Sequence, residues 1–410
     1  MYNPPNNAYS NVPQPRMRPR FEKRARPSRL LTLRILVFIS LLHLALVPRM
    51  VWSAPVVSSY QTSTEEGFSL TIEGANFGAG PHIVVFDDFD NRLPGSTLTD
   101  GPPTIGHWYT GSTPITNSGG VDGNQSALVL DSDNTGRTPM VAGIADPSQP
   151  RGLKLFQEVF FQVDIKDLGY FPGRDGTADT FSTESSAKDV WMMLGPRGDN
   201  TSYSKTDGHD LIIPTWTGGG FSVGGNETRM SPSYWQKGLN GDWAFQDWNQ
   251  ITFHARLDPA NPYGDVIAGI FGYTNNSGTV FNPRAGNFMS DQTADGIQEA
   301  AWDRLKIGGW YRAGGDNRKR IMDNVYVAVG DNAAARVEIA NSKDYFAATR
   351  RYILPHQVWS SGRIVTRAIA LKGVDLPGFY VFVTDGEGRR TTQGVPVCPQ
   401  CPSAPRLQIH

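Results

Sequence analysis

The segment Phe68–Gly78, with the sequence Phe-Ser-Leu-Thr-Ile-Glu-Gly-Ala-Asn-Phe-Gly, constrains the fold of this chain more than any other short stretch. Apolar and polar residues alternate up to Glu73, which is the pattern of a half-buried β-strand. Gly74 and Gly78 then supply a turn. One strand and one turn cannot bury a hydrophobic core, so this strand needs partners elsewhere in the chain.

Together with Pro55–Ser59, this segment resembles the opening of an IPT/TIG domain, a small immunoglobulin-like β-sandwich. Such a domain usually closes with a Trp-Ser strand, an alternating strand and a third strand that ends in a glycine-rich turn. Nothing similar follows Gly78 directly. Three similar pieces stand near the far end of the chain, at Val358–Ser361, Ile364–Ile369 and Phe379–Gly388.

The resemblance implies a discontinuous sandwich made of residues 55–86 and 334–397, split by an inserted domain at residues 87–333. The alternative is two unrelated β segments at the two ends of the chain. The two interpretations differ in whether strands from 55–86 share a sheet with strands beyond residue 334.

The composition agrees with an all-β chain. Of the 410 residues, 44 are glycine and 29 are proline, and 11% are aromatic, which is typical of many short strands joined by turns. The length suits two or three domains with ample core. The formal net charge of −1 argues against nucleic acid as a main partner.

Residues 1–54 have the layout of a targeting segment. A basic stretch precedes the apolar run Leu30–Val47, and the small residues Ser53 and Ala54 follow it. This order predicts a secretory signal peptide cleaved near Ser53 or Ala54, and therefore a secreted or cell-surface protein. The alternative is an uncleaved membrane anchor, which would be the only membrane contact that the sequence predicts.

The two cysteines, Cys398 and Cys401, lie in a tail at residues 398–410. Two cysteines alone cannot form a tetrahedral structural zinc site. In an exported chain, this spacing favours a small-loop disulfide between them.

Short strand-like runs recur through residues 87–333, which favours a sandwich or jelly roll. Their order resembles a concanavalin A-like jelly roll, the fold of the lectin, glucanase and LamG group. Three pieces carry this resemblance, at Phe86–Asp90, Asp247–Asp258 and Ile307–Ala328. It implies that the first and last strands of the insert are neighbours, and that its ends lie close together.

Hydrolysis and elimination are the two kinds of polysaccharide cleavage that a jelly-roll insert suggests. No strand shows the paired acids that a glycosidase needs. For a polysaccharide lyase, Trp310–Gly314 faintly resembles a lyase strand, and the candidate catalytic residues are His209, His254, Tyr311 and Arg312.

Acidic residues near both ends of the insert suggest a metal site. Asp87, Asp88 and Asp90 stand in the predicted first strand, and Asp323 stands in the predicted last one. Calcium prefers clustered carboxylate and carbonyl oxygens, and jelly rolls of this group often join these strands through one Ca²⁺. The sequence therefore predicts a structural calcium ion, with solvated acids at strand ends as the alternative.

Tryptophans in polar, glycine-rich surroundings suggest a binding role. Sugar rings pack on aromatic faces, and loop residues on a rigid scaffold commonly carry function. The candidates for ligand binding are Trp108, Trp216, Trp235 and Trp243.

The sequence thus predicts an all-β protein, an immunoglobulin-like sandwich with an inserted jelly roll, that binds a polysaccharide or a cell-surface glycan without cleaving it. A polysaccharide lyase or glycosidase is the first alternative. A structural surface-layer or appendage subunit, which self-assembles through sheet edges or apolar patches, is the second.

Overall fold

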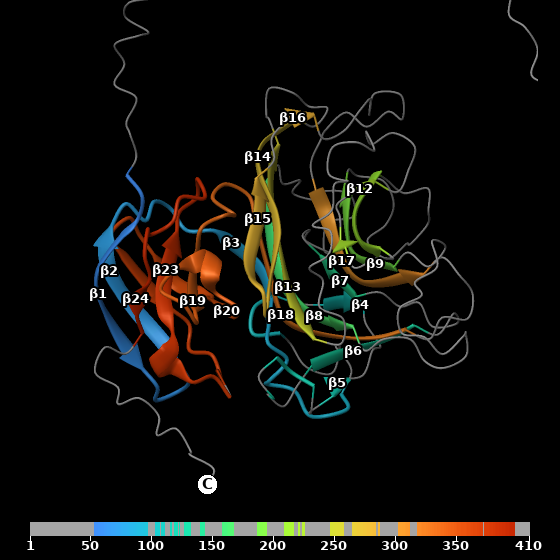
Figure 1. Cartoon of the computed structure of the whole chain (residues 1–410), viewed down its shortest axis with the longest axis horizontal. Coiled ribbons are helices and arrows are strands. Elements are labelled where there is room, and N and C mark those ends of the chain that lie inside the picture. The colour runs from blue at the N-terminus through green and yellow to red at the C-terminus, as the bar shows by residue number, and fades with distance from the viewer. Residues whose placement is uncertain are drawn as a thin grey trace, which may run out of the picture. The chain divides into compact units, whose positions relative to one another are not determined.

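The computed structural model describes the following parts of the chain: residues 53–96, 103–106, 108–110, 115–116, 119–121, 123, 127–132, 140–143, 158–167, 187–194, 209–216, 220–221, 224–225, 247–257, 265–283, 286–287, 302–311, 318–371 and 373–397. These residues form an all-β structure of four antiparallel sheets, and no α-helix occurs among them (Figure 1). Two short 3₁₀ helices, η3 (Tyr345–Ala347) and η4 (Leu376–Gly378), lie in connections.

The first and last parts of the described chain build one small sandwich. Its first sheet has the order β1 (Val56–Ser63), β2 (Ser69–Ala75), β22 (Arg363–Thr366), β21 (His356–Trp359). Its second sheet has the order β20 (Arg351–Leu354), β19 (Arg336–Ala340), β23 (Tyr380–Thr384), β24 (Val395–Pro396). Figure 1 shows the blue strands β1 and β2 beside the red strands β23 and β24.

Strand pairing joins the two ends of the chain directly. Ile72 of β2 lies opposite Ile364 of β22, and both side chains are fully buried in one core that also contains Val337 and Val381. Strands β1 and β2 therefore share a sheet and a core with strands beyond residue 334, whereas β3 (His82–Asp87) belongs to a sheet of the insert. Neither part has enough strands to bury an apolar face alone.

The Gly74–Gly78 turn is fixed by its contact with the distant segment 358–362. The Gly74 amide donates to the Gly362 carbonyl at 2.9 Å, and the Phe77 amide donates to the Ser361 carbonyl at 3.1 Å. A Cβ on Gly74 would lie 2.0 Å from the Val56 carbonyl oxygen, and Gly78 has φ +70°. Close backbone approach at the first position and a left-handed conformation at the last explain the two glycines.

The inserted segment forms two larger sheets. The nine-stranded sheet has the path β15 (Gly278–Pro283), β14 (Asp265–Asn275), β13 (Trp248–Leu257), β8 (Glu158–Asp167), β18 (Arg318–Val329), β6 (Ala127–Ser132), β5 (Ile115–Thr116). Two further strands complete it: β3 (His82–Asp87) pairs with β18, and β16 (Gly286–Asn287) pairs with β14.

The seven-stranded sheet has the path β11 (Gly220–Phe221), β10 (His209–Trp216), β9 (Ala187–Leu194), β17 (Trp302–Tyr311), β7 (Met140–Gly143), β4 (Trp108–Thr110), and β12 (Gly224–Gly225) pairs with β10. It contacts the nine-stranded sheet where β17 meets β6 and where β7 meets β3.

The chain enters and leaves the insert along adjacent strands. Asp87 at the end of β3 lies opposite Val325 of β18, and β18 leads into β19 of the small sandwich. Because these two strands pair antiparallel, the ends of the insert lie side by side. An insertion with adjacent ends leaves the host sandwich intact.

Both faces of the nine-stranded sheet are buried at its centre. On one face, Phe253 lies opposite Phe161, and the two rings stack at 5.2 Å between centroids. On the other face, Thr252 lies opposite Gln162, and both of these polar residues are buried too. The second face carries the contacts to the small sandwich.

Candidate functional site

The polar face of β13 joins the insert to the small sandwich. Gln250 Nε2 donates to the Arg351 carbonyl at 2.8 Å, and Arg351 Nη2 donates to Thr252 Oγ1 at 3.0 Å. Further along the strand, Arg256 Nη2 donates to the Gly386 carbonyl at 2.6 Å. These bonds leave few of the polar groups of this buried face without a partner, as burial requires.

Arg351 is the centre of this junction and is almost completely buried. Its Nη1 donates to Glu338 Oε1 at 2.8 Å, and its Nε donates to Thr274 Oγ1 at 2.8 Å. Arg336 Nε donates to the other Glu338 oxygen at 2.9 Å. Burial by itself would raise the pKa of Glu338, but Arg336 and Arg351 hold it below its usual value. The carboxylate therefore remains ionised inside the protein.

His254, a candidate lyase base, lies in the same junction. Its Nε2 is 2.8 Å from Glu158 Oε1, and the His254 side chain is 5% exposed. Burial lowers the pKa of His254 in spite of the opposing effect of Glu158. The imidazole is thus a neutral group that donates to a buried carboxylate, and substrate cannot reach it. His254 is not available as a catalytic base, which corrects the role suggested by the sequence.

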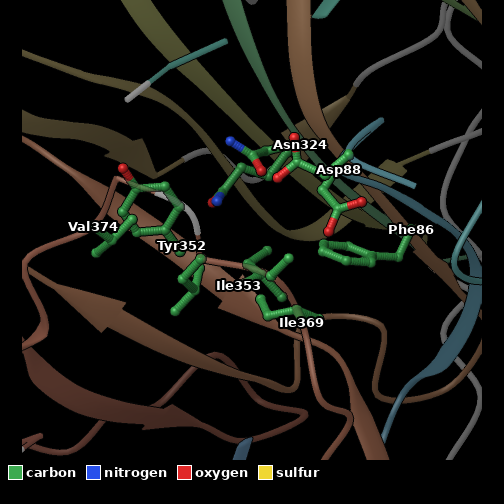
Figure 2. A pocket seen from close by; sticks show the side chains of 11 residues that line it. Phe86, Asp88, Asn324, Tyr352, Ile353, Ile369 and Val374 are labelled. Atoms are coloured by element: carbon green, nitrogen blue, oxygen red, sulfur yellow. The ribbon is translucent and has the colours of Figure 1, made fainter. Parts of the chain in front are cut away.

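A small cavity opens at the edge of the junction, between β3, β18 and the small sandwich (Figure 2). Asp88 and Asn324 line it from the insert, and Tyr352, Ile353 and Ile369 line it from the sandwich. It measures about 20 Å³, which is room for one water molecule and not for a sugar ring. The buried hydroxyl of Tyr352 has no hydrogen-bond partner among the described residues.

Asp88 and Asp90 both line this cavity, and the pKa of Asp88 is shifted strongly. Burial is the largest influence on Asp88, followed by repulsion from Asp87 and Asp90, and together they raise its pKa to about 6. A carboxyl group in such surroundings favours its protonated form.

The four aspartates predicted to bind calcium do not form one ligand set. Asp87 pairs with Arg92 at 2.6 Å and accepts from the indole of Trp108. Asp323 accepts from the Val121 amide at 3.0 Å. No three His, Cys, Asp or Glu side chains gather to hold a metal ion in the described part of the chain. Asp87 and Asp323 therefore do not share one metal site with Asp88 and Asp90. Calcium binding by this protein stays a prediction.

Trp108 is buried, whereas the sequence predicted an exposed ring that binds a ligand. The side chain is 6% exposed, and its ring stacks on Phe89 with 6.4 Å between centroids. The indole N–H is satisfied by Asp87. Trp108 therefore contributes to packing between β4 and the end of β3 and presents no ring to a ligand.

The seven-stranded sheet separates two other lyase candidates. His209 lies opposite Leu194 of β9, whereas Tyr311 lies opposite Ala187 at the other end of the same strand. Seven residues of strand separate these positions by about 23 Å. The two backbones therefore lie too far apart for one catalytic centre.

The same register places two tryptophan positions at one end of the sheet. Trp310 of β17 and Pro214 of β10 both lie opposite Lys188 of β9, and Trp216 follows two residues after Pro214. By strand alternation, Trp216 belongs to the same face of the sheet as Trp310. Two strand spacings, about 10 Å, separate β10 from β17.

Several predicted residues lie outside the described part of the chain. They are the targeting segment up to Trp52, Arg312, Trp235, Trp243, Cys398 and Cys401. For Lys188, His209, Trp216, Trp310 and Tyr311 the backbone alone is described. No helix in the described residues is long and apolar enough to cross a membrane.

The junction residues were missed by sequence reasoning. Arg336–Ala340 reads as an alternating strand with charged residues at every other position, a pattern that normally predicts a solvated face. The structure buries Arg336 and Glu338 instead. No local signal marks this, because the covering strands come from the inserted domain.

No protein-family model matches this chain, and no curated protein matches it in sequence. Among solved structures, it is similar to an alginate lyase from a Chlorella virus, with 15% identity over 60% of this chain and 100% of the other, at TM-score 0.36. It is similar to an alginate lyase from Aplysia kurodai, with 10% identity over 53% and 87%, at TM-score 0.34. It is also similar to the Lotus tetragonolobus seed lectin, with 8% identity over 50% and 86%, at TM-score 0.26. At these scores the likeness assigns neither a ligand nor an activity to this chain.

Proposed function

We propose that this chain is a secreted or cell-surface protein that binds a polysaccharide through its inserted domain and does not cleave it. The observation that carries the proposal is the aromatic end of the seven-stranded sheet, defined by Trp216 and Trp310 with Lys188 between them. Tryptophans at these positions, on two strands that flank β9, supply the aromatic residue type that packs on the flat C–H faces of sugar rings. A rigid sheet holds such residues in place better than a loop does.

The packing of the small sandwich on the nine-stranded sheet also supports a binding surface on the seven-stranded sheet. The outer face of the nine-stranded sheet is occupied at its centre by the small sandwich, through Arg351, Thr252 and Gln250. A polysaccharide cannot enter there, because the cavities at the junction are far smaller than a sugar ring. The seven-stranded sheet and its loops are the alternative surface of the insert.

The absence of cleavage is proposed from the placement of the lyase candidates. His254 is closed off beneath the small sandwich, and His209 lies at the opposite end of its sheet from Tyr311. A β-elimination needs a base and an acid on one sugar residue. The candidate bases, His209 and His254, lie in different parts of the structure from the candidate acid, Tyr311.

A glycan array followed by titration tests the proposal. Trp216→Ala and Trp310→Ala should each weaken polysaccharide binding roughly thirtyfold, because truncating a buried aromatic anchor commonly costs about 2 kcal/mol. Leu93→Ala is the matched control. Leu93 is 79% exposed and lies outside this sheet, so its loss should leave affinity unchanged.

Two results would contradict the proposal. Binding that survives both tryptophan changes would remove the aromatic end as the binding surface. Release of unsaturated or reducing sugar ends by the unaltered protein would establish a lyase or a glycosidase instead.

An assembly role is the second candidate function, and strand β1 favours it. β1 lies at the end of its sheet, so its outer edge has no strand partner in the described residues. The strand is largely exposed and carries no charged residue or proline, the features that usually protect an edge from pairing with another chain. Light scattering of the exported protein over a range of concentrations tests this, and a monomer throughout would exclude self-assembly.

A further inference from the structure

The second sheet of the small sandwich contains more positive than negative charge. Arg336 and Arg351 both bind Glu338, and these three side chains are at most 2% exposed. Arg390, on the segment after β23, acts electrostatically on the same carboxylate. Three guanidinium groups thus share one carboxylate, although buried charges are normally paired one with another.

Arg390 is the member of this cluster with capacity left for another partner. In the described part of the chain, the hydrogen bond of its side chain runs from Nε to Thr384 Oγ1, at a long 3.3 Å. Its guanidinium carbon lies 3.4 Å from the ring centroid of Tyr345. Burial lowers the pKa of Arg390, and repulsion from Arg336 and Arg351 lowers it further, against the opposing effects of Tyr345 and Glu338.

An exposed aromatic ring stands next to this guanidinium. Phe346 in η3 is 56% exposed, and the Arg390 guanidinium carbon lies 6.0 Å from its ring centroid. The neighbouring Val280 on the edge strand β15 is 40% exposed. A guanidinium stacked on one ring and flanked by another is held in a fixed direction, which favours paired hydrogen bonds to a planar anion.

We infer that Arg390 and Phe346 form a second binding site, on the small sandwich, for a carboxylate carried by a sugar ring, that is, for an acidic residue of a polysaccharide. The terminal nitrogens of Arg390 bind the carboxylate, and Phe346 packs against the C–H face of the ring. The bound anion supplies the negative charge that the Arg336–Glu338–Arg351 cluster lacks. The choice of a sugar as the carrier rests on the proposed glycan binding, whereas the carboxylate site rests on the charge and geometry of these residues.

Titration of the full exported chain with D-glucuronate and with D-glucose tests the inference. We expect glucuronate to bind and the neutral sugar to bind at least tenfold more weakly, since a charge-assisted hydrogen bond is worth about a tenfold to a hundredfold change in affinity. Arg390→Gln should remove this preference. Phe346→Ala should weaken glucuronate binding severalfold with only a small loss of thermal stability, because Phe346 is 56% exposed and contacts Phe281 and Tyr345 edge-on.

Arg389→Gln is the matched control for the charge. Arg389 Nε pairs with Asp385 at 2.8 Å, so its replacement should leave glucuronate affinity unchanged. Because Arg390→Gln could disturb packing on Tyr345, Phe346→Ala provides an independent arm in a protein that keeps its fold. Saturation-transfer NMR then shows whether ring protons of the bound glucuronate lose contact with the protein in this variant.

The outcomes separate this inference from the proposed function. Equal affinity for glucuronate and glucose, or glucuronate affinity unchanged by Arg390→Gln, overturns the carboxylate site while leaving polysaccharide binding at Trp216 and Trp310 intact. Binding of hexaglutamate but not of glucuronate overturns the sugar assignment in favour of an acidic peptide. Glucuronate binding with no polysaccharide bound on the array retains the site and refutes the proposed function.

Discussion

Both faces of the nine-stranded sheet bury their central residues, but the inner face buries apolar side chains and the outer face buries many polar ones. Phe253 is 0% exposed on the inner face, and the next residue along β13, Thr252, is 1% exposed on the outer one. The inner row continues through Phe161 and Val327, whereas the outer row continues through Gln162 and Tyr326. The inner face needs shape complementarity, but the polar groups of the outer face also need partners, which they find either within the sheet, as His254 does in Glu158, or in the small sandwich, as Thr252 does in Arg351.

This comparison teaches that the polar alternation of a strand can prepare a surface for a second domain rather than for water. Hydrogen bonds at the outer face connect residues 99 and 101 positions apart in the chain, from Arg351 to Thr252 and from Gln250 to Arg351. The outer face therefore depends on the whole chain. The inner face depends on the insert alone.

The largest expected effect comes from Arg351→Ala, which removes the central group of the outer face. It removes one of the two guanidinium groups that pair with the buried Glu338, and it leaves Thr274 and Thr252 without the guanidinium donor of Arg351. We expect a loss of about 3–5 kcal/mol in the free energy of unfolding, because breaking a buried ion pair leaves a buried charge behind. Urea denaturation followed by fluorescence measures this loss.

Arg350→Ala is the control for that change. Arg350 is partly exposed and donates to the carbonyl of its neighbour Thr349, and it is no part of the buried ion pairs, so its removal should cost less than 1 kcal/mol. If Arg351→Ala proved as mild as Arg350→Ala, the junction would not be a cooperative part of the fold.

The next largest effect concerns Asp88, in the cavity at the edge of the junction. Replacing this residue should increase the free energy of unfolding instead of lowering it. Because the pKa of Asp88 is raised to about 6, ionisation of Asp88 destabilises the folded state at neutral pH. Stability should therefore rise as pH falls through 6 toward the unfolded value near 4, where both states bind the proton. Asp88→Asn should stabilise the protein at pH 7 by about 2 kcal/mol.

Asp375→Asn is the control, since Asp375 makes no side-chain capping bond in η4. Thermal unfolding between pH 5 and pH 7, with calcium and with EDTA, also sharpens the calcium prediction. A bound cation would lower the pKa of Asp88 and reverse the trend. A protein that is more stable at pH 7 with calcium, and less stable as Asp88→Asn, would restore Asp88 as a metal ligand.

The smallest effect compares single groups on the two faces. Thr252→Val deletes the hydroxyl that links Gln162 and Arg351, and it should cost about 1–2 kcal/mol. Ile251→Val on the inner face removes one methylene and should cost about 0.5–1.5 kcal/mol.

The two changes differ in their response to Arg351→Ala. In that background, Thr252→Val should cost measurably less, because its partner is already gone, whereas Ile251→Val should cost the same. Strict additivity of Thr252→Val with Arg351→Ala would show that the two side chains do not interact in solution.

Much of the fold could be predicted from local patterns. Alternating residues placed the strands at Phe68–Glu73, Trp248–Leu257 and Asn324–Val329 close to their observed positions. The two glycines of the turn and the similar segment at Val358–Ser361 indicated the shared sheet. These signals are local because backbone conformation and side-chain period are properties of a few consecutive residues.

The candidate sites were harder to predict. His254 and Trp108 carry the residue types of a catalytic base and a stacking platform, yet their burial removes both from those roles. The charged surroundings of Arg390 come from Arg336, Glu338 and Arg351, which strand pairing brings together from separate segments. Residue type states what a group can do, but its surroundings decide whether it is reachable and charged.

The sequence by itself determined that this chain forms β-strands, where they turn, and which residues of each strand fall on the same side. Only the tertiary structure decided what covers each side. The reason is physical: alternation follows from the geometry of one strand, whereas burial follows from which distant strands pack against it. At β13 the same period-two pattern thus produced an apolar core on one face and a hydrogen-bonded domain junction on the other.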